Sequence, residues 1–125
     1  MRQTVRVSIE SSRNGGWVVC DRCRVADSAP ARMVGLLGRR ALDPGEGLML
    51  TRAFAIHTLF MSFPIDAVFV DAGLSVIGVR SHLRPWRAAA VRGAAAVLEL
   101  GAGEAERRGV APGERLRLDP VRGLR

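Results

Sequence analysis

Residues 65–79, IDAVFVDAGLSVIGV, decide the fold of this chain. Residues 65–70 are apolar at both odd and even positions apart from Asp66, which is typical of a strand covered on both faces. Asp71, Ala72 and Gly73 supply a tight turn, and residues 74–79 return as a second strand. The segment therefore predicts an antiparallel hairpin whose first strand lies at the centre of a sheet.

The rest of the chain reads as short strands joined by short loops. Alternating or apolar runs predict strands at 4–9, 17–25, 48–51, 55–59, 96–100 and 115–118. A capping residue, Asp27 or Ser28, begins a short helix that ends at Gly38, and residues 103–108 form a second helical turn. We therefore expect an α+β domain, mainly antiparallel β with two short helices. Rolling its sheet into a partly closed barrel would hide the edge strands.

Length and composition predict one domain. With 125 residues, of which 48% are apolar and 25% charged, the chain can fold around a single core without a metal or a disulfide. We expect a single compact domain over residues 1–118 and a frayed tail over residues 119–125. No run of 18 apolar residues and no apolar signal region is present, so we expect a cytoplasmic protein that does not enter the membrane. The oligomeric state stays open.

The charge of the chain comes from arginine alone. All 19 basic residues are arginines, so Schiff-base catalysis and a P-loop lysine are excluded. A net charge of +7 favours anionic partners. A compositional bias toward arginine would raise the same count without any binding role.

Three motifs together resemble one known family. They are RMVGLLGR at 32–39, HTLFMSFPIDAVFVD at 57–71 and AVLELGAGEAERRGVAPGERL at 96–116. In this order and spacing they are similar to the family called domain of unknown function 192, over about residues 25 to 118. The resemblance implies a small β-rich fold and no particular activity.

The second motif holds the first candidate site, His57 and Asp66. A carboxylate in a buried strand needs a partner, and an arginine paired with it would make a structural brace. The candidate arginines are Arg32, Arg39, Arg84 and Arg87. Alternatively, Asp66 orients His57 as the general base of a hydrolase or lyase, although no serine or cysteine nucleophile stands at a recognisable elbow.

The second candidate site is the loop SHLRPWR, residues 81–87, inside a stretch without acidic residues from 72 to 98. Arg84 and Arg87 can bind phosphate or carboxylate with two hydrogen bonds each, and Trp86 offers a stacking face. We predict that this loop and the segment from His57 to Asp66 face each other across a concavity. There they would bind an anionic ligand or a protein partner without catalysis.

Two other interpretations of this loop stay open. The loop is equally consistent with a solvated connection that Pro85 and Trp86 clamp to the body. The arginine-rich surface could also bind nucleic acid nonspecifically, but no motif for specific nucleic-acid recognition accompanies it.

Cys20 and Cys23 form a C-x-x-C pair and, with His57 and His82, make up all the cysteines and histidines of the chain. In a regular strand, residues three apart point to opposite faces, so the pair is poorly placed to chelate. The setting also lacks the helix N-terminus of a redox motif. We therefore predict no metal site and no cofactor.

Overall fold

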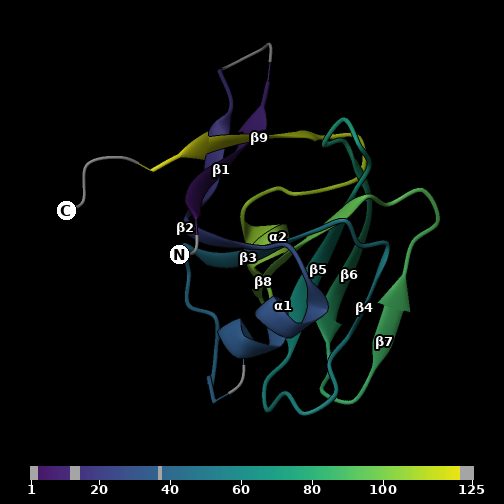
Figure 1. Ribbon diagram of the computed structural model, residues 1–125. Coiled ribbons are helices and arrows are strands. Elements are labelled where there is room, and N and C mark those ends of the chain that lie inside the picture. Colours follow the sequence, from purple (N-terminus) through teal and green to yellow (C-terminus); the bar gives the residue numbers. More distant parts are fainter. Residues whose placement is uncertain (1–2, 12–14, 37, 122–125) are drawn as a thin grey trace.

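A computed structural model describes residues 3–11, 15–36 and 38–121 (Figure 1). The strands are β1 (Thr4–Glu10), β2 (Trp17–Ala26), β3 (Glu46–Thr51), β4 (Ala55–His57), β5 (Ile65–Val70), β6 (Val76–Leu83), β7 (Ala88–Ala90), β8 (Ala96–Gly101) and β9 (Arg115–Pro120), and the helices are α1 (Ala29–Leu36) and α2 (Glu104–Arg107). Seven strands form one sheet in the order β6-β5-β8-β3-β2-β1-β9, and β4 pairs with β7 in a second sheet.

The hairpin of β5 and β6 is confirmed. The two strands pair antiparallel, and every residue of β5 is buried between β6 and β8. Asp71 shapes the turn, because its Oδ1 accepts the N–H groups of Gly73 and Ser75, both at 2.9 Å. This turn is wider than the sequence predicts, so β6 begins at Val76 instead of residue 74.

The main sheet is mixed. β2 and β3 are parallel, because α1 carries the chain between them as a crossover connection. The other pairings in this sheet are antiparallel, as expected. The mostly β architecture with two short helices is therefore confirmed.

The sheet is not closed into a barrel, so the expectation of partial closure is not supported. The outermost strands, β6 and β9, touch at one end only, through a bridge between Ser75 and Arg115. There the N–H of Val76 donates to the Glu114 carbonyl and the N–H of Leu116 to the Leu74 carbonyl, both at 2.8 Å. The strands are not paired beyond this corner. The free part of β9 instead carries charged side chains, which discourage pairing with another chain.

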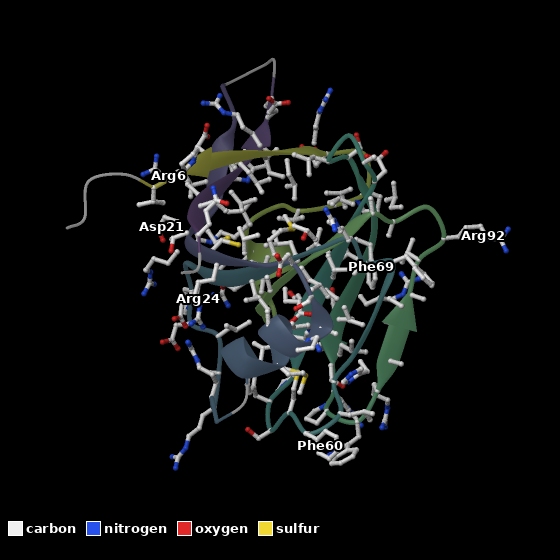
Figure 2. All side chains as sticks on the ribbon, viewed as in Figure 1. Arg6, Asp21, Arg24, Phe60, Phe69 and Arg92 are labelled. Carbon is white, nitrogen blue, oxygen red and sulfur yellow. The ribbon has the colours of Figure 1, made fainter. Side chains whose placement is uncertain are left out.

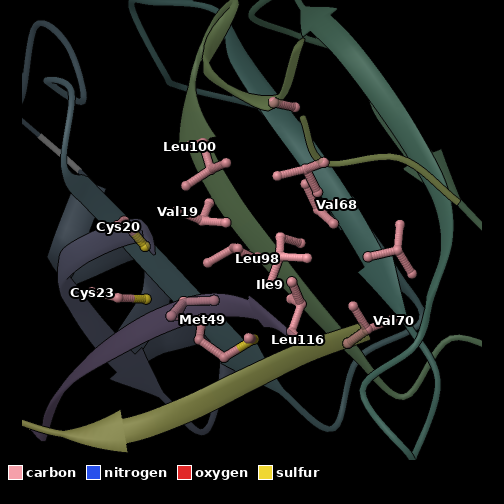
Figure 3. Close-up of a cluster of buried hydrophobic side chains, with 14 of the residues drawn as sticks. Ile9, Val19, Cys20, Cys23, Met49, Val68, Val70, Leu98, Leu100 and Leu116 are labelled. Atoms are coloured by element: carbon pink, nitrogen blue, oxygen red, sulfur yellow. The ribbon is translucent and has the colours of Figure 1, made fainter. Parts of the chain in front are cut away.

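Two apolar clusters cover the two faces of the sheet. Successive residues of β5 alternate between them: Val68 and Val70 belong to the first cluster, and Ala67 and Phe69 to the second. The first cluster lies between β5 and β8 on one side and β1 and β9 of the same sheet on the other, because the sheet curls over it (Figure 3). The second is covered by α1 and the sheet of β4 and β7.

Two local differences from the sequence-based expectation bear on function. β7 consists of three alanines, which have low β-propensity, so the sequence does not predict it. β9 runs to Pro120, two residues past the expected domain boundary, while residues 122–125 lie outside the described part of the chain. No helix among the described residues is long and apolar enough to cross a membrane.

Candidate functional site

Thr58 holds the predicted binding loop against the end of β4. Its N–H donates to the Arg87 carbonyl at 2.7 Å, and its carbonyl accepts the N–H of Trp86 at 2.9 Å. Its hydroxyl donates to the Arg84 carbonyl at 2.5 Å and accepts the N–H of Arg87 at 2.9 Å. Thr58 is fully buried. Four hydrogen bonds to Thr58 therefore hold the backbone of the loop in place.

This clasp presents two aromatic rings to solvent. The rings of Phe60 and Trp86 meet edge to face, with centroids 4.9 Å apart and planes at 63°. Phe60 is 66% exposed and Trp86 57% exposed, and Phe60 lies at the extremity of the molecule (Figure 2). Both residues have left-handed backbone conformations, with φ of 68° and 65°. Bulky residues seldom adopt this conformation, so the surrounding hydrogen bonds must enforce it.

Beside the aromatic pair lies a shallow hollow of about 440 Å³. Among the residues that the structure describes, its lining includes Arg80, His82, Arg84 and Arg87 and no acidic residue. An arginine-lined hollow attracts phosphate or carboxylate groups, which guanidinium forks bind with two hydrogen bonds each. We call Leu59, Phe60, Arg84, Trp86 and Arg87, together with this hollow, the arginine–aromatic tip.

His57 lies next to the tip but not in the hollow. It is the last residue of β4, half-buried, and pairs with Ala88 of β7. Its Nδ1 accepts the N–H of Leu59 at 3.3 Å, so the ring is turned toward its own chain. The imidazole thus supports the turn that leads into Phe60.

Asp66 is fully buried and binds two backbone groups. Its Oδ1 accepts the N–H of His82 at 2.9 Å, and its Oδ2 accepts the N–H of Ala105 at 2.9 Å. The carboxylate is therefore a brace that ties β5 to β6 and α2. The expectation of an arginine partner was wrong, because none of the four candidate arginines is bonded to Asp66 in the described structure.

The two predicted segments pack directly on each other and do not face across an open concavity. Thr58 and the aromatic pair join them. Of the five candidate residues, Arg84, Trp86 and Arg87 come together at the tip and His57 lies beside it. Asp66 reaches the tip only indirectly, by fixing the backbone of His82 in the hollow's wall. Among described residues, no hydrogen bond joins His57 to Asp66, so the dyad of the enzymatic alternative is not formed.

The structure contains a buried ion pair that the sequence does not predict. Arg32 of α1 donates from Nε to Oε2 of Glu99 at 2.5 Å, and both side chains are almost completely buried. Oε1 of Glu99 has no partner among described atoms. Burial raises the pKa of the Glu99 carboxyl, and Arg32 opposes this rise only in part. The signal was present in AVLEL, a single acid within a buried strand.

The two cysteines lie on the same face of β2, contrary to the expectation from a regular strand. Cys20 pairs with Val7 and Cys23 with Val5, because a bulge inserts one extra residue between them. Both thiols point into the first core cluster (Figure 3). A hydrogen bond between the protonated Cys23 thiol and Cys20, together with burial, raises the pKa of Cys23 far above its ordinary value. Among described residues, no group of three or more potential ligands gathers to hold a metal ion.

Comparison with known proteins places the chain in a family. The family described as Uncharacterized ACR, domain of unknown function 192, matches residues 10–118. The chain belongs to this family. The match begins earlier than the resemblance expected from the motifs and therefore includes β2 and its cysteines. None of the curated proteins matches the chain.

Two crystal structures share the fold of this family member. A protein of unknown function from Novosphingobium aromaticivorans has a TM-score of 0.75 and 25% identity, over 90% of this chain and 83% of its own. A protein from Sinorhizobium meliloti described as a "putative transcription regulator" has a TM-score of 0.79 and 25% identity, over 94% of this chain and 96% of its own. The comparisons thus establish family and fold without a specific function.

Proposed function

We propose that this member of the domain of unknown function 192 family is a noncatalytic binding module. Its arginine–aromatic tip would hold an anionic ligand or the anionic part of a protein partner. The observation that carries the proposal is the pair of Phe60 and Trp86, both largely exposed and both held in left-handed backbone conformations. Exposed rings on a strained backbone offer the fold little stability, which favours a role in recognition.

The charges beside the rings define the ligand chemistry. Arg84 and Arg87 are exposed and form no ion pair in the described structure, so their guanidinium groups are available. Arg80 and His82 extend the same hollow. A phosphate or carboxylate would bind the guanidinium forks, and an apolar part of the ligand would rest on Trp86 or Phe60.

The hydrolase or lyase alternative receives less support. It requires a carboxylate to orient His57, whereas Asp66 is occupied by two backbone N–H groups. The imidazole of His57 accepts a backbone N–H on its own turn. The geometry supports binding better than proton transfer.

Titration with inorganic pyrophosphate, followed by the backbone amide NMR signals of the non-proline residues from 80 to 87, tests the proposal. We expect saturable shifts at the tip, weakened at higher salt, and their loss in the triple variant Arg84→Ala, Trp86→Ala, Arg87→Ala, with Tm nearly unchanged. The matched control is Arg6→Gln with Arg117→Gln, which removes two exposed charges on β1 and β9, away from the tip. Unchanged binding by the triple variant, or a large loss of its stability, would contradict a recognition role for the tip.

Nonspecific nucleic-acid binding predicts a different result. A single-stranded oligonucleotide would then bind wild type and the triple variant with comparable affinity, because 19 arginines are spread over the chain. Its affinity would also fall steeply with salt. Selective loss in the triple variant favours the tip instead.

A further inference from the structure

The strand β7 has one free edge. It pairs with β4 in the register Ala55↔Ala90, Ile56↔Ala89, His57↔Ala88. The ladder continues at both ends, where the N–H of Val91 donates to the Phe54 carbonyl at 3.1 Å and the N–H of Thr58 to the Arg87 carbonyl at 2.7 Å. Within the described residues, β7 has no strand on its other side, and it is the outermost arrow in Figure 1.

The register determines which backbone groups are free. In an antiparallel ladder, hydrogen-bonded and non-hydrogen-bonded pairs alternate. Since the pairs at positions 54/91 and 58/87 are bonded, the pair at 56/89 is bonded as well. The N–H and C=O groups of Ala88 and Ala90 therefore point away from β4. They offer two donors and two acceptors to a further strand.

The outer face of this small sheet carries mainly alanine side chains. Ala55, Ala88 and Ala90 are exposed on it and the half-buried His57 lies opposite Ala88, whereas Ile56 on the other face is buried in the second core cluster. The Phe60 and Trp86 rings border the sheet at one end. Phe54, which is 63% exposed, follows the alternation of Ile56 and lines a separate hollow with Asp27 and Ala29. Exposed apolar surface bordered by aromatic rings is typical of a protein-binding face.

The surrounding charge selects the partner. No acidic residue occurs in the sequence from 72 to 98. Arg84 and Arg87 precede β7 and Arg92 follows it, and all three side chains are exposed. Arg92 extends from the molecule into solvent (Figure 2). A second copy of this chain, with its own charge of +7, would be repelled. The face is complementary to a segment with both carboxylates and apolar side chains.

We infer that β7 accepts an acidic, extended segment of a partner protein as an additional strand. The inference rests on the proposed function, because the arginines of the tip would receive the partner's carboxylates. The partner's backbone pairs with Ala88 and Ala90, and its apolar side chains on the outer face lie next to these two alanines, near the Phe60 and Trp86 rings.

The test uses a blocked heptapeptide of alternating glutamate and valine as the probe, with the full chain, in a calorimetric or NMR titration. The decisive variant is Ala90→Pro, which removes an outward N–H and no bond to β4, a position where an edge strand tolerates proline. The matched control is Ala90→Ser, which keeps the N–H. We expect at least tenfold weaker binding by Ala90→Pro, with binding by Ala90→Ser equal to wild type and equal Tm in all three.

A second arm does not depend on the folding of any variant. Two versions of the same peptide carry N-methyl groups on alternate residues, one on the glutamates and the other on the valines. Each version keeps its charge but loses the N–H donors along one edge. Only one edge of the peptide faces β7, so we expect one methylated peptide to bind wild type at least tenfold more weakly and the other to bind like the unmethylated peptide. A lysine–valine peptide should not bind. Equal binding of both methylated peptides and the unmethylated peptide, equal binding by Ala90→Pro, or no binding of the acidic peptide would overturn strand addition.

The outcomes separate this inference from the proposed function. If pyrophosphate binds the tip but the peptide is insensitive to Ala90→Pro and to methylation, the anion site stands and strand addition falls. If Ala90→Pro and methylation abolish peptide binding while pyrophosphate shifts nothing at the tip, the small-anion site falls. In that case the Arg84→Gln, Arg87→Gln variant must still weaken the peptide, or the acidic character of the partner is wrong.

Discussion

The carboxylate of Asp66 accepts the backbone N–H of Ala105, 39 positions further along the chain, while its other oxygen accepts the N–H of His82. A single side chain of β5 thereby fixes α2 on one side and the left-handed residue of β6, with φ of 52°, on the other. Asp66 is structural, yet the hollow of the tip depends on it because His82 forms part of the wall.

Asp66→Asn tests this brace. The asparagine amide keeps one acceptor but places an NH₂ group against a backbone N–H, so we expect a loss of about 1–3 kcal/mol in the free energy of unfolding, measured in urea. Asp71→Asn is the control, because both N–H groups at that turn bind the same Oδ1, an acceptor that asparagine keeps. Equal losses in the two variants would show that Asp66 is not a buried brace.

Thr58→Val tests the clasp of the loop. Valine has a similar shape but leaves the Arg84 carbonyl and the Arg87 N–H without their partner, so we expect a loss of about 1–3 kcal/mol and faster amide exchange at residues 84–87. The control is Ser62→Ala, which removes an exposed hydroxyl bonded to the Arg39 carbonyl. Slow exchange retained in Thr58→Val would mean that the loop is held by other contacts.

Removing one charge of the Arg32–Glu99 pair is expected to lower the free energy of unfolding far more than removing both charges. Glu99→Leu leaves a buried guanidinium without its carboxylate, and we expect roughly 3–5 kcal/mol of destabilisation. The double variant Arg32→Met, Glu99→Leu removes both charges and is expected to recover most or all of the loss. A double-mutant cycle by urea unfolding measures the coupling. A double variant as unstable as Glu99→Leu would show that the charge is not the cause.

The raised pKa of Glu99 also fixes the sign of a pH effect. The folded chain binds this proton at higher pH than the unfolded chain does, whose carboxyl titrates near its ordinary value of 4.5. The contribution of Glu99 is therefore full below that value and is lost as the pH rises through the folded pKa.

We expect wild type to gain stability relative to the double variant as the pH falls from about 7 toward about 4.5. Glu46 is the internal contrast. Burial raises its pKa, but the N–H of Asp43 and the Arg39 guanidinium outweigh burial, so the pKa is lowered and the stability that Glu46 supplies is lost as the pH falls. Relative to Glu46→Gln, wild type should therefore lose stability as the pH falls over the same range. Parallel slopes for the two variants would contradict the assignment.

Local sequence patterns were sufficient for most of the fold. The apolar run of β5, the turn at Asp71 and the charges of α2 are signals within a few residues of one another, and the structure confirms the elements they predict. The parallel pair of β2 and β3 depends on how α1 returns the chain, and β7 depends on pairing across more than thirty residues with β4. Neither interaction leaves a periodic pattern in the sequence.

The candidate site was predictable in composition but not in geometry. An acid-free stretch with arginines and a tryptophan marked the loop, and the structure places Arg84, Trp86 and Arg87 together. The contribution of Thr58 could not be foreseen, because its four hydrogen bonds exist only once the loop folds back onto β4. The same holds for Asp66, whose partners are backbone groups and so carry no side-chain signature.

The buried thiols supply the last prediction. Cys20 and Cys23 lie in the first core cluster, and hydrogen bonding and burial disfavour the thiolate of Cys23, so a disulfide reagent such as Ellman's reagent should not react with the folded chain. Both thiols should react together, at a rate that rises with urea in parallel with global unfolding, because β2 is an inner strand of the sheet, between β3 and β1. In the Cys23→Ala variant, the labelling rate of Cys20 should change only by the factor that the change in the free energy of unfolding predicts. Rapid labelling of one thiol in the folded protein would show instead that β2 opens locally at its bulge, between the positions that pair with Val5 and Val7.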